Sequence, residues 1–421
     1  MKGSKRLVAA ALGKLATAAA LALGMALAAS GGETWRWPQF HGPRRDNKSD
    51  ETGLLKQWPE GGPKLLWTAK GIGRGFSTVA IAGGLIYTTG NIGRDTVITA
   101  LGLDGTKVWT AANGPAWSRE IPGTRGTPTI DGDRLYHENA DGDVVCLDAR
   151  TGKKVWGLNI LKKFGGRNIR WGLAESLLID GGRVICTPGG TRVTMAALDK
   201  GTGKTVWTCE GAREKPGYAS AILVEYGGAR QIITMMSASV VGVHADTGKL
   251  LWQQKHPAYM DETVSTPVFH DGLVAVSTLG PGATQCIKLS VDGGAVSARQ
   301  AWRTRALDNH HGGILLLDGH LYGTKVRRDW LCLELATGKV VHRADGVGKG
   351  SLTYADGMLY TYSEKGLVGL VKATPKEHKV ISSFRVPKGG RGPAWAHPVV
   401  CNGRLYLRHG DFLYCYDIRA R

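Results

Sequence analysis

The sequence has few cysteines, and none of them is spaced as in the common cysteine motifs. Its 421 residues include seven cysteines, with no adjacent pair, no Cys-x-x-Cys and no Cys-x-x-Cys-His. This excludes a zinc ribbon, a dithiol redox motif, a c-type haem attachment and a disulfide between neighbouring residues. Because seven is odd, at least one cysteine stays unpaired within the chain, and the sequence leaves the pairing of Cys186, Cys209 and Cys401 open.

Long apolar runs are also scarce, and the longest follows a basic start, MKGSKR, at the N-terminus. The apolar stretch LATAAALALGMALAA comes after Lys14 and contains small residues at Ala26 and Ala28. It is shorter than the ~20 residues that a membrane-spanning helix needs. The pattern therefore predicts a secretory signal peptide over residues 1–28. No later segment approaches that length, so we expect no transmembrane segment and a periplasmic or secreted protein.

Acidic residues are outnumbered, with 35 Asp and Glu against 54 Lys and Arg, which gives a formal net charge of +19. Cleavage after residue 28 would remove four cations, Lys2, Lys5, Arg6 and Lys14, and leave +15. Export argues against nucleic acid as a partner. The scattered basic residues favour either solubility or contact with an anionic envelope component.

Helical periodicity is hard to find, whereas glycine, at 61 residues, is about twice its usual share. Short Val, Ile, Leu and Tyr runs lie between Asp-Gly, Gly-Gly and Asn-Gly pairs, which is typical of strands joined by tight turns. One turn recurs: DARTGKKVW at 148–156, DKGTGKTVW at 199–207, HADTGKLLW at 244–252 and ELATGKVVH at 334–342. The Asp and Thr of this turn can hydrogen-bond its backbone, and the Gly can take a positive φ.

Aligning these copies gives a repeated unit of four short strands, marked by two series of residues. A bulky ring is expected on the fourth strand of each unit at Trp67, Trp109, Trp156, Trp207, Trp252, Trp302, His342 and Phe384. A small residue is expected on the third strand at Ala100, Cys146, Ala197, Gly242, Cys286, Cys332, Gly369 and Cys415. Each series has eight members. The sequence therefore predicts an all-β, eight-bladed β-propeller of four-stranded antiparallel blades.

The two ends of the repeat are out of phase. The strand around Trp67 has no partners before it, and the strand around Cys415 has nothing after it. We expect the N-terminal strand to pair into the last blade, which covers edges that would otherwise be exposed. The predicted organisation is an N-terminal extension at 29–63, lying across a face of the first or last blade, and a single propeller at 64–421.

The motif Ala-x-Asp-x-x-Thr-Gly-Lys-x-x-Trp resembles the tryptophan-docking repeat of the pyrroloquinoline quinone (PQQ)-like β-propellers, over nearly all of the mature chain. The stretches NIRWGLAES, NHHGG, SLTYADGMLY and PAWAHPVVCNGRLYLR are similar to exported bacterial members that are often labelled alcohol dehydrogenases by similarity. For the dehydrogenase branch, the resemblance implies PQQ with Ca²⁺ held by Glu, Asn and Asp, below a disulfide of adjacent cysteines. No motif in this sequence matches that site, so the cofactor stays unknown.

Ligands of propellers usually meet the mouth of the central channel, where the first strand of each blade begins. The residues expected there as ligand-binding candidates are Arg74, Arg125, Trp171, Glu175, Glu262, His311, Lys349, Trp395 and His397, with Phe76, Tyr218 and His310 beside them. Arg and Lys suit an anionic group, indole suits a planar ring or sugar, and Glu suits a base. We expect no metal site, because the adjacent His310 and His311 would point to opposite faces of a strand.

Three functions remain open from the sequence. The favoured one is a periplasmic platform that binds a protein or a small ligand. The alternatives are a PQQ-dependent oxidoreductase of alcohols or sugars, whose catalytic residues are unknown, and a binder of anionic polysaccharide or cell envelope. The sequence does not name a substrate, a partner protein or an oligomeric state.

Overall fold

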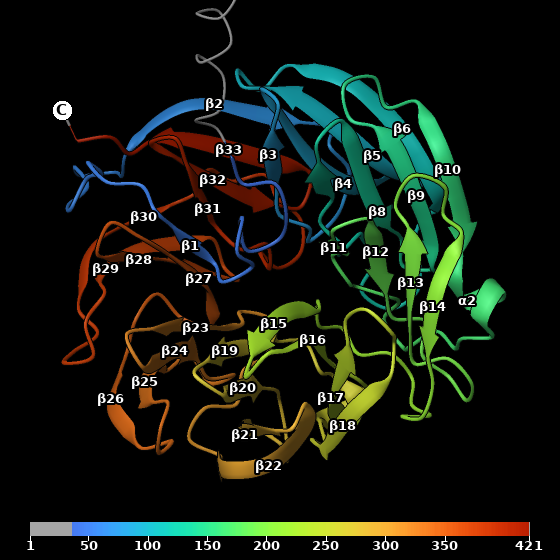
Figure 1. Ribbon diagram of the computed structural model, residues 1–421. Coiled ribbons are helices and arrows are strands. Elements are labelled where there is room, and N and C mark those ends of the chain that lie inside the picture. The colour runs from blue at the N-terminus through green and yellow to red at the C-terminus, as the bar shows by residue number, and fades with distance from the viewer. Residues whose placement is uncertain (1–35, 421) are drawn as a thin grey trace, which may run out of the picture.

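The protein forms a closed ring of eight four-stranded antiparallel sheets, as the sequence predicts. The computed structural model describes residues 36–420, so the predicted signal peptide lies outside the described residues. Figure 1 shows the blades following one another around a central axis in chain order. The first strands of most neighbouring blades contact one another around this axis. No described helix is both long and apolar enough to cross a membrane.

The first four blades are built from consecutive strands. Blade 1 contains β3 (Ala80–Ala82), β4 (Leu85–Ile92), β5 (Asp95–Gly102) and β6 (Lys107–Pro115). Blade 2 contains β7 (Thr129–Asp131), β8 (Arg134–Glu138), β9 (Asp143–Asp148) and β10 (Lys154–Asn159), followed by the short helix α2 (Ile160–Phe164). Blade 3 contains β11 (Leu178–Asp180), β12 (Arg183–Cys186), β13 (Met195–Asp199) and β14 (Thr205–Cys209). Blade 4 contains β15 (Ile222–Tyr226), β16 (Ala229–Met235), β17 (Ser239–His244) and β18 (Leu250–Lys255).

A 3₁₀ turn at Tyr259–Asp261 leads into the second half of the ring. Blade 5 contains β19 (Val268–His270), β20 (Leu273–Ser277), β21 (Thr284–Asp292) and β22 (Ala295–Thr304). Blade 6 contains β23 (Ile314–Leu317), β24 (His320–Thr324), β25 (Trp330–Glu334) and β26 (Val340–Ala344). Blade 7 contains β27 (Gly350–Ala355), β28 (Met358–Ser363), β29 (Leu367–Lys372) and β30 (Val380–Arg385), with β1 (Lys48–Ser49) added in parallel to β27. Blade 8 contains β31 (Val399–Cys401), β32 (Arg404–His409), β33 (Phe412–Asp417) and β2 (Lys64–Lys70).

The ring is closed by the N-terminal strand, which confirms the predicted closure. Strand β2 pairs antiparallel with β33, and Trp67 lies opposite Cys415. Blade 8 is therefore made of three strands from the C-terminus and one from the start of the propeller. This pairing covers the outer edge of β33, which would otherwise be exposed.

The recurring turn is a docking site for the tryptophan of the preceding blade. Trp109 Nε1 donates to the carbonyl of Ala149 at 3.1 Å, and Trp156 Nε1 donates to the carbonyl of Lys200 at 2.9 Å. Gly152 of the turn has φ +72°, and a Cβ there would lie 2.6 Å from the Trp109 ring. The turn therefore needs glycine both for its backbone conformation and for the close approach of the indole.

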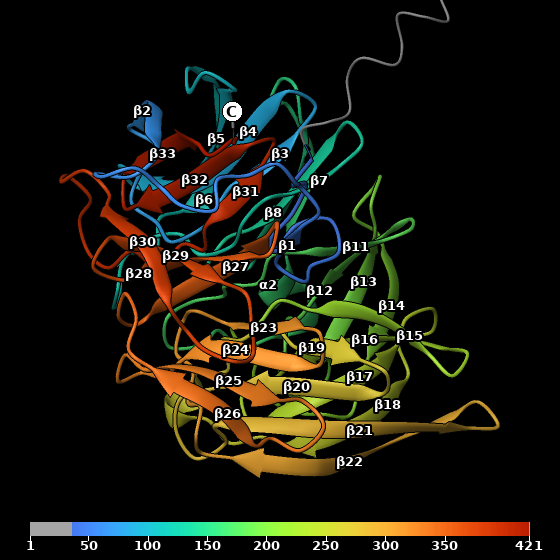
Figure 2. The same ribbon diagram turned by 90° about the vertical axis from the view of Figure 1, so that its left-hand side faces the viewer.

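Two blades depart from this pattern. In blade 7, the Phe384 ring packs against Gly62, as the tryptophans pack against the turn glycines, but Ser383 and not Phe384 is the cross-strand partner of Gly369. The bulge lies one pair nearer the turn there, because the stretch KATPKEHKV replaces the usual Thr-Gly-Lys turn. In blade 4, Trp252 Nε1 donates to Gln231 of its own blade at 2.7 Å, because blade 5 offers the long β21–β22 hairpin in place of the turn. This hairpin projects beyond the ring in Figure 2.

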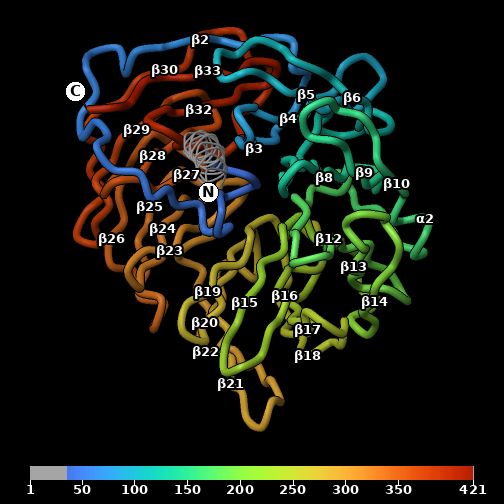
Figure 3. The backbone as a smooth tube through the Cα atoms, turned by 45° about the horizontal axis from the view of Figure 1, so that its top comes forward, coloured from blue at the N-terminus to red at the C-terminus, as the bar shows by residue number. Residues whose placement is uncertain are grey.

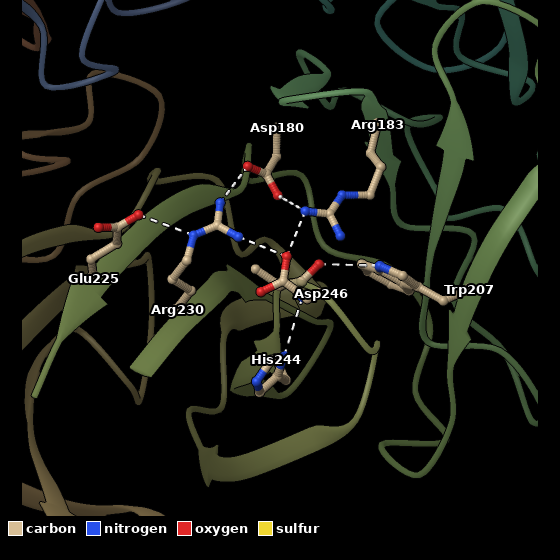
Figure 4. Close-up of polar contacts among 8 residues, drawn as sticks. Asp180, Arg183, Trp207, Glu225, Arg230, His244 and Asp246 are labelled. Atoms are coloured by element: carbon tan, nitrogen blue, oxygen red, sulfur yellow. Dashed lines mark hydrogen bonds and ion pairs between the residues drawn. The ribbon is translucent and has the colours of Figure 1, made fainter. Parts of the chain in front are cut away.

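Ion pairs add to the seam between blades 3 and 4 (Figure 4). Asp180, which is 5% exposed, accepts from Arg183 at 2.9 Å and from Arg230 at 2.6 Å. Asp246 accepts from the same two guanidinium groups at 2.7 Å each. Two acids and two arginines from adjacent blades therefore form one network at this seam.

The seven cysteines are all free and buried, which answers the question of their pairing. Cys146, Cys286, Cys332 and Cys415 occupy the small position of the third strand, where each is fully buried. Cys therefore serves there as a small apolar residue, in the same role as Ala100 and Ala197 in other blades.

The N-terminal extension reaches further into the ring than the sequence suggested. Trp37 forms a two-way backbone bridge with Ile81 of blade 1, and the carbonyl of Pro38 accepts from Ile130 of blade 2. Arg45 donates to Ser176 and Leu177 at the start of blade 3. Asn47 bonds to blade 7 through Leu352, Thr353 and Tyr354. Residues 36–49, which we call the axial segment, therefore cross the channel and bind inner strands on opposite sides of it (Figures 1 and 3).

Candidate functional site

A pocket lies on the ring axis at the end where the first strands begin. Its cavity volume is about 150 Å³. Side chains from the axial segment and from every blade except blade 7 line it: Phe40, His41, Phe76, Ile121, Arg125, Trp171, Ala174, Ser176, Tyr218, Ser220, Glu262, Val264, Ser265, Thr266, His310, His311, Gly313, Trp395 and His397. We call this the axial pocket. The axial segment supplies Phe40 and His41, so the pocket does not continue as an open channel on that side.

One wall of the axial pocket is an aromatic cluster from blades 8, 1 and 6. Trp395 stacks on His311 with ring centroids 5.4 Å apart and lies 5.0 Å from the Phe76 ring. The indole N–H of Trp395 donates to Glu364 at 3.3 Å, and Glu364 also pairs with Lys349 at 2.8 Å. Glu364 therefore fixes the orientation of the indole from behind the pocket.

The facing wall comes from blades 3 and 4. Trp171 and Tyr218 have ring centroids 5.9 Å apart, and the Tyr218 hydroxyl accepts from the backbone N–H of Trp171 at 3.3 Å. On its other side, Trp171 is covered by the Arg170 guanidinium at 5.1 Å, which is itself paired with Glu120. Two flat apolar faces thus lie on different sides of the axis.

Arg125, from blade 2, lies between these two walls. Its guanidinium donates to the carbonyls of Gly123 at 2.8 Å and Ile121 at 2.9 Å, and it lies 5.7 Å from the Phe76 ring. Within residues 36–420 it forms no ion pair with a carboxylate. Desolvation lowers its pKa to about 10, so the side chain remains a cation at neutral pH. The pocket therefore has one positive charge that lacks a counter-ion.

Glu262 is the one carboxylate that lines the axial pocket, and it comes from blade 5. Burial raises its pKa, while Arg170 and Lys349 act in the opposite direction. Its Oε2 atom is buried and has no hydrogen-bond partner among residues 36–420. An acceptor in this state gains from a ligand that brings a donor, because an unpaired buried polar atom costs about 1–3 kcal/mol.

The floor of the pocket is a chain of buried histidines. His397 Nε2 lies 3.0 Å from the carbonyl oxygen of His311, so it is the protonated nitrogen of a neutral ring. His397 Nδ1 is then an acceptor, and His41 Nε2, at 3.0 Å, donates to it. Burial lowers the pKa of His397 to about 4 and that of His41 well below its usual value. These rings are neutral at pH 7 and add no charge to the pocket.

His311 provides a second unpaired polar atom. It is 8% exposed, its Nδ1 lies 3.2 Å from His310 Nδ1, and its Nε2 is buried without a partner. Burial, followed by the nearby His310 and Lys349, lowers its pKa well below the usual value. The two rings are in a loop before β23, not in a strand, and both line the pocket.

Six of the nine candidate residues from the sequence line the axial pocket: Arg125, Trp171, Glu262, His311, Trp395 and His397. The other three lie elsewhere. Glu175 is buried behind the inner strands, where it accepts from Thr187, and burial raises its pKa to about 7. Lys349 is paired with Glu364 and lines a small cleft of blade 7.

Arg74 lines a separate open cleft at the seam between blades 8 and 1. The cleft has a volume of about 610 Å³ and also contains Lys70 and Arg391. Its acid, Asp411, accepts from the backbone N–H groups of Gly71 and Gly73 at 3.1 and 2.6 Å. The cleft is therefore basic and solvent-accessible, unlike the axial pocket.

Phe40, His41 and Glu364 were not predicted from the sequence. Phe40 and His41 belong to the axial segment, which has no repeat to align with, so nothing in the pattern placed it on the axis. Glu364 lies in the turn after β28, away from the strand starts that were searched. For His41, the one indication in the sequence is the unusual density of aromatic and charged residues at 35–47.

Comparison with known proteins identifies the fold family. The family model described as outer membrane protein assembly factor BamB matches residues 26–173 and 94–344, which together cover more than half of the chain. The chain belongs to this family of PQQ-like β-propellers. The overlap of the two matched ranges is expected for a propeller whose blades repeat one motif.

Solved structures show the same fold at low sequence identity. BamB from Moraxella catarrhalis is 14% identical, with a TM-score of 0.59, over 85% of this chain and 98% of that one. Quinohemoprotein alcohol dehydrogenase from Comamonas testosteroni is 13% identical, with a TM-score of 0.63, over 94% and 82%. A europium-containing methanol dehydrogenase is 12% identical, with a TM-score of 0.62, over 90% and 91%. No curated protein sequence matches the chain significantly.

The axial pocket of this PQQ-like propeller does not fit PQQ with Ca²⁺. Ca²⁺ takes six to eight oxygen ligands, but Glu262 is the one carboxylate that lines the pocket. Within residues 36–420 no group of three or more His, Cys, Asp and Glu side chains is placed to hold a metal ion. The cavity of about 150 Å³ is small for a fused tricyclic quinone, and the free, separate cysteines form no disulfide above it.

Proposed function

We propose that this propeller is an exported binding protein whose axial pocket takes a small ligand. The observation that supports this most directly is the set of unpaired groups around one pocket on the ring axis. In the part of the chain that the structure describes, Arg125 lacks a counter-ion, and Glu262 Oε2 and His311 Nε2 lack partners. Folding does not gain from leaving such groups unsatisfied in a pocket, whereas binding does.

Export is part of the proposal and rests on the N-terminal sequence and on the family description. The basic start and apolar run favour a signal peptide over 1–28. The family model is described as an outer membrane protein assembly factor, and a periplasmic or secreted location agrees with that description. N-terminal sequencing of the exported protein tests this part, since a protein that begins at Met1 would contradict it.

An oxidoreductase function is less well supported than binding. The relatives named alcohol or methanol dehydrogenases share the fold at 12–13% identity, which is too low to transfer an activity. The pocket residues, as described above, do not form a site for PQQ with Ca²⁺. Addition of both to the purified protein should therefore produce no bound-quinone absorbance.

The seam cleft supports a second candidate function, the binding of an anionic envelope polymer. Lys70, Arg74 and Arg391 are all exposed, and Asp411 is already engaged by backbone N–H groups. Retention on an anionic polysaccharide should weaken steeply with salt if this cleft binds it. Retention that does not change when Arg74 and Arg391 are both replaced by Gln would contradict this candidate.

A pair of Ala→Phe variants tests whether the axial pocket binds a ligand. Ala174 lines the pocket, so Ala174→Phe should fill roughly one ring of its volume. Ala295 lies at the exposed tip of the β21–β22 hairpin and provides the same chemical change far from the pocket. We expect a thermal-shift screen of sugars, carboxylates, alcohols and amines to stabilise wild type and Ala295→Phe but not Ala174→Phe. Ligands that stabilise all three proteins equally would contradict the proposal.

A further inference from the structure

The chemistry of the axial pocket restricts the ligand further. We propose that it binds a single-ring aromatic carboxylate with a hydroxyl or amino donor at the end of the ring opposite the carboxylate. This inference rests on the proposed function, because it names the ligand class of the same pocket. Size, charge, wall shape and the position of the unpaired acceptors each contribute to it.

The pocket is half open, and the size of its inner cavity favours a ligand with one ring. A buried cavity of about 150 Å³ in another protein is known to hold benzene, and the axial pocket has a volume of about 150 Å³. Fused ring systems and disaccharides exceed this volume. A single ring with substituents at its two ends fits between the axial segment and the mouth.

The positive charge in the pocket favours a ligand with a carboxylate. Arg125 is the one permanent cation that lines the cavity, and its guanidinium contacts only neutral carbonyls and the Phe76 ring. The four histidines around the pocket are neutral at pH 7 because burial lowers their pKa values. A ligand carboxylate would supply the missing counter-charge, and the planar guanidinium matches its two oxygens.

The aromatic walls of the pocket favour a ligand with a flat ring. Trp395 with Phe76, and Trp171 with Tyr218, form two aromatic pairs from blades 8 and 1 and from blades 3 and 4. Arg125 comes from blade 2, which lies between these pairs in the ring. A carboxylate at Arg125 therefore directs the body of the ligand between the two pairs. Aromatic faces in such pairs favour another π-system over a ring of hydroxyl groups.

The far end of the pocket favours a ligand that brings a hydrogen-bond donor. Glu262 and His311 come from blades 5 and 6, across the axis from blade 2. Glu262 Oε2 and His311 Nε2 are both buried without a partner. A hydroxyl or amino group at the end of the ring away from the carboxylate would reach this side and pair with Glu262.

Calorimetry with five probe molecules tests the ligand class on the mature full-length protein. We expect 4-hydroxybenzoate to bind most tightly. Loss of charge in 4-hydroxybenzamide, of the hydroxyl in benzoate, of planarity in cyclohexanecarboxylate, or of the aromatic ring in glucuronate should each weaken binding, by about tenfold for the amide. Equal affinity for 4-hydroxybenzoate and its amide would overturn the proposal, as would tighter binding of glucuronate.

Variants assign each end of the ligand to a residue. Arg125→Gln should weaken the binding of 4-hydroxybenzoate by about tenfold but leave the binding of 4-hydroxybenzamide unchanged. Unchanged binding of the amide also shows that the variant is folded. Glu262→Gln should remove the preference for 4-hydroxybenzoate over benzoate. Arg299→Gln, at an exposed position of β22 far from the pocket, should change neither affinity. An Arg125→Gln protein that keeps wild-type affinity for the carboxylate would overturn the assignment.

The two levels of the proposal fail in different ways. If none of the probes binds, but another small molecule stabilises wild type and not Ala174→Phe, the ligand class is wrong and the binding function stands. If Ala174→Phe changes the binding of no small molecule, both proposals are wrong.

Discussion

His397 shows at the residue scale how burial fixes a protonation state. It is 6% exposed, and the carbonyl of His311 and the ring of His41 occupy its two nitrogens. Burial lowers the pKa of His397 to about 4, and a proton added at Nδ1 would also leave His41 without its acceptor. The floor of the axial pocket therefore depends on a neutral imidazole.

His397→Gln should remove a pH-dependent loss of stability. Above pH 6.5 the ring is neutral in both the folded and the unfolded protein, so it contributes no pH dependence there. Between pH 6.5 and about 4 the unfolded chain takes up a proton that the folded protein does not. Wild type should therefore lose about 2–3 kcal/mol relative to the variant across that window. Urea unfolding of both proteins at pH 7, 5.5 and 4.5 measures the difference, and parallel pH profiles would contradict the prediction.

The docking turn is the element that makes the repeat visible in the sequence. Thr151 and Arg150 donate their backbone N–H groups to Asp148, and Gly152 receives the Trp109 ring from the preceding blade. Each turn residue thus has a partner either within the turn or in the neighbouring blade. The motif survives in the sequence because both sets of contacts need the same residues.

Gly152→Ala should separate the contribution of the ring contact from that of the backbone. The variant places a Cβ 2.6 Å from the indole at φ +72°, so it should lose about 1 kcal/mol to strain and about 1–3 kcal/mol more to overpacking. Gly132→Ala, at φ +57° with open space around it, should lose only the stability that backbone strain costs. Denaturant unfolding measures both, and equal losses would mean that the indole does not require the glycine.

Elements without a repeat were harder to predict. Blade 7 has no Thr-Gly-Lys turn, and the sequence did not predict that its fourth strand would place Ser383 opposite Gly369. The axial segment occurs once, and its partners Ile81, Ser176 and Leu352 lie in three different blades. Local patterns define strands and turns well, but they do not show which distant carbonyls a single irregular segment will bind.

At the scale of the whole molecule, eightfold repetition made the ring predictable and the pocket only partly so. Strand starts converge on the axis, so Arg125 and Trp395 could be placed near one another although most of the chain separates them. A shift of one or two residues along a strand start decides whether a side chain faces the axis. Glu175, one residue before Ser176 of the pocket, turns instead toward Thr187.

The β2–β33 pairing joins the two ends of the propeller without a covalent bond, and a disulfide across it should strengthen the whole molecule. Lys70 and Phe412 are cross-strand partners of β2 and β33, and Lys70→Cys with Phe412→Cys would enclose almost the entire propeller in one loop. Cross-linking a long loop removes more entropy from the unfolded chain than cross-linking a short one. We expect a gain of about 2–4 kcal/mol in the free energy of unfolding, which reduction should remove.

A matched disulfide within a single hairpin provides the control for ring closure. Lys288 and Arg299 are cross-strand partners of β21 and β22, both exposed, and their cysteine pair would close only a short loop. It should therefore add less stability than the pair at Lys70 and Phe412. Denaturant midpoints of the two oxidised variants, each compared with its reduced form, measure the two gains. If both gains are equal, a covalent closure of the ring at β2 and β33 stabilises the propeller no more than a disulfide within one hairpin does.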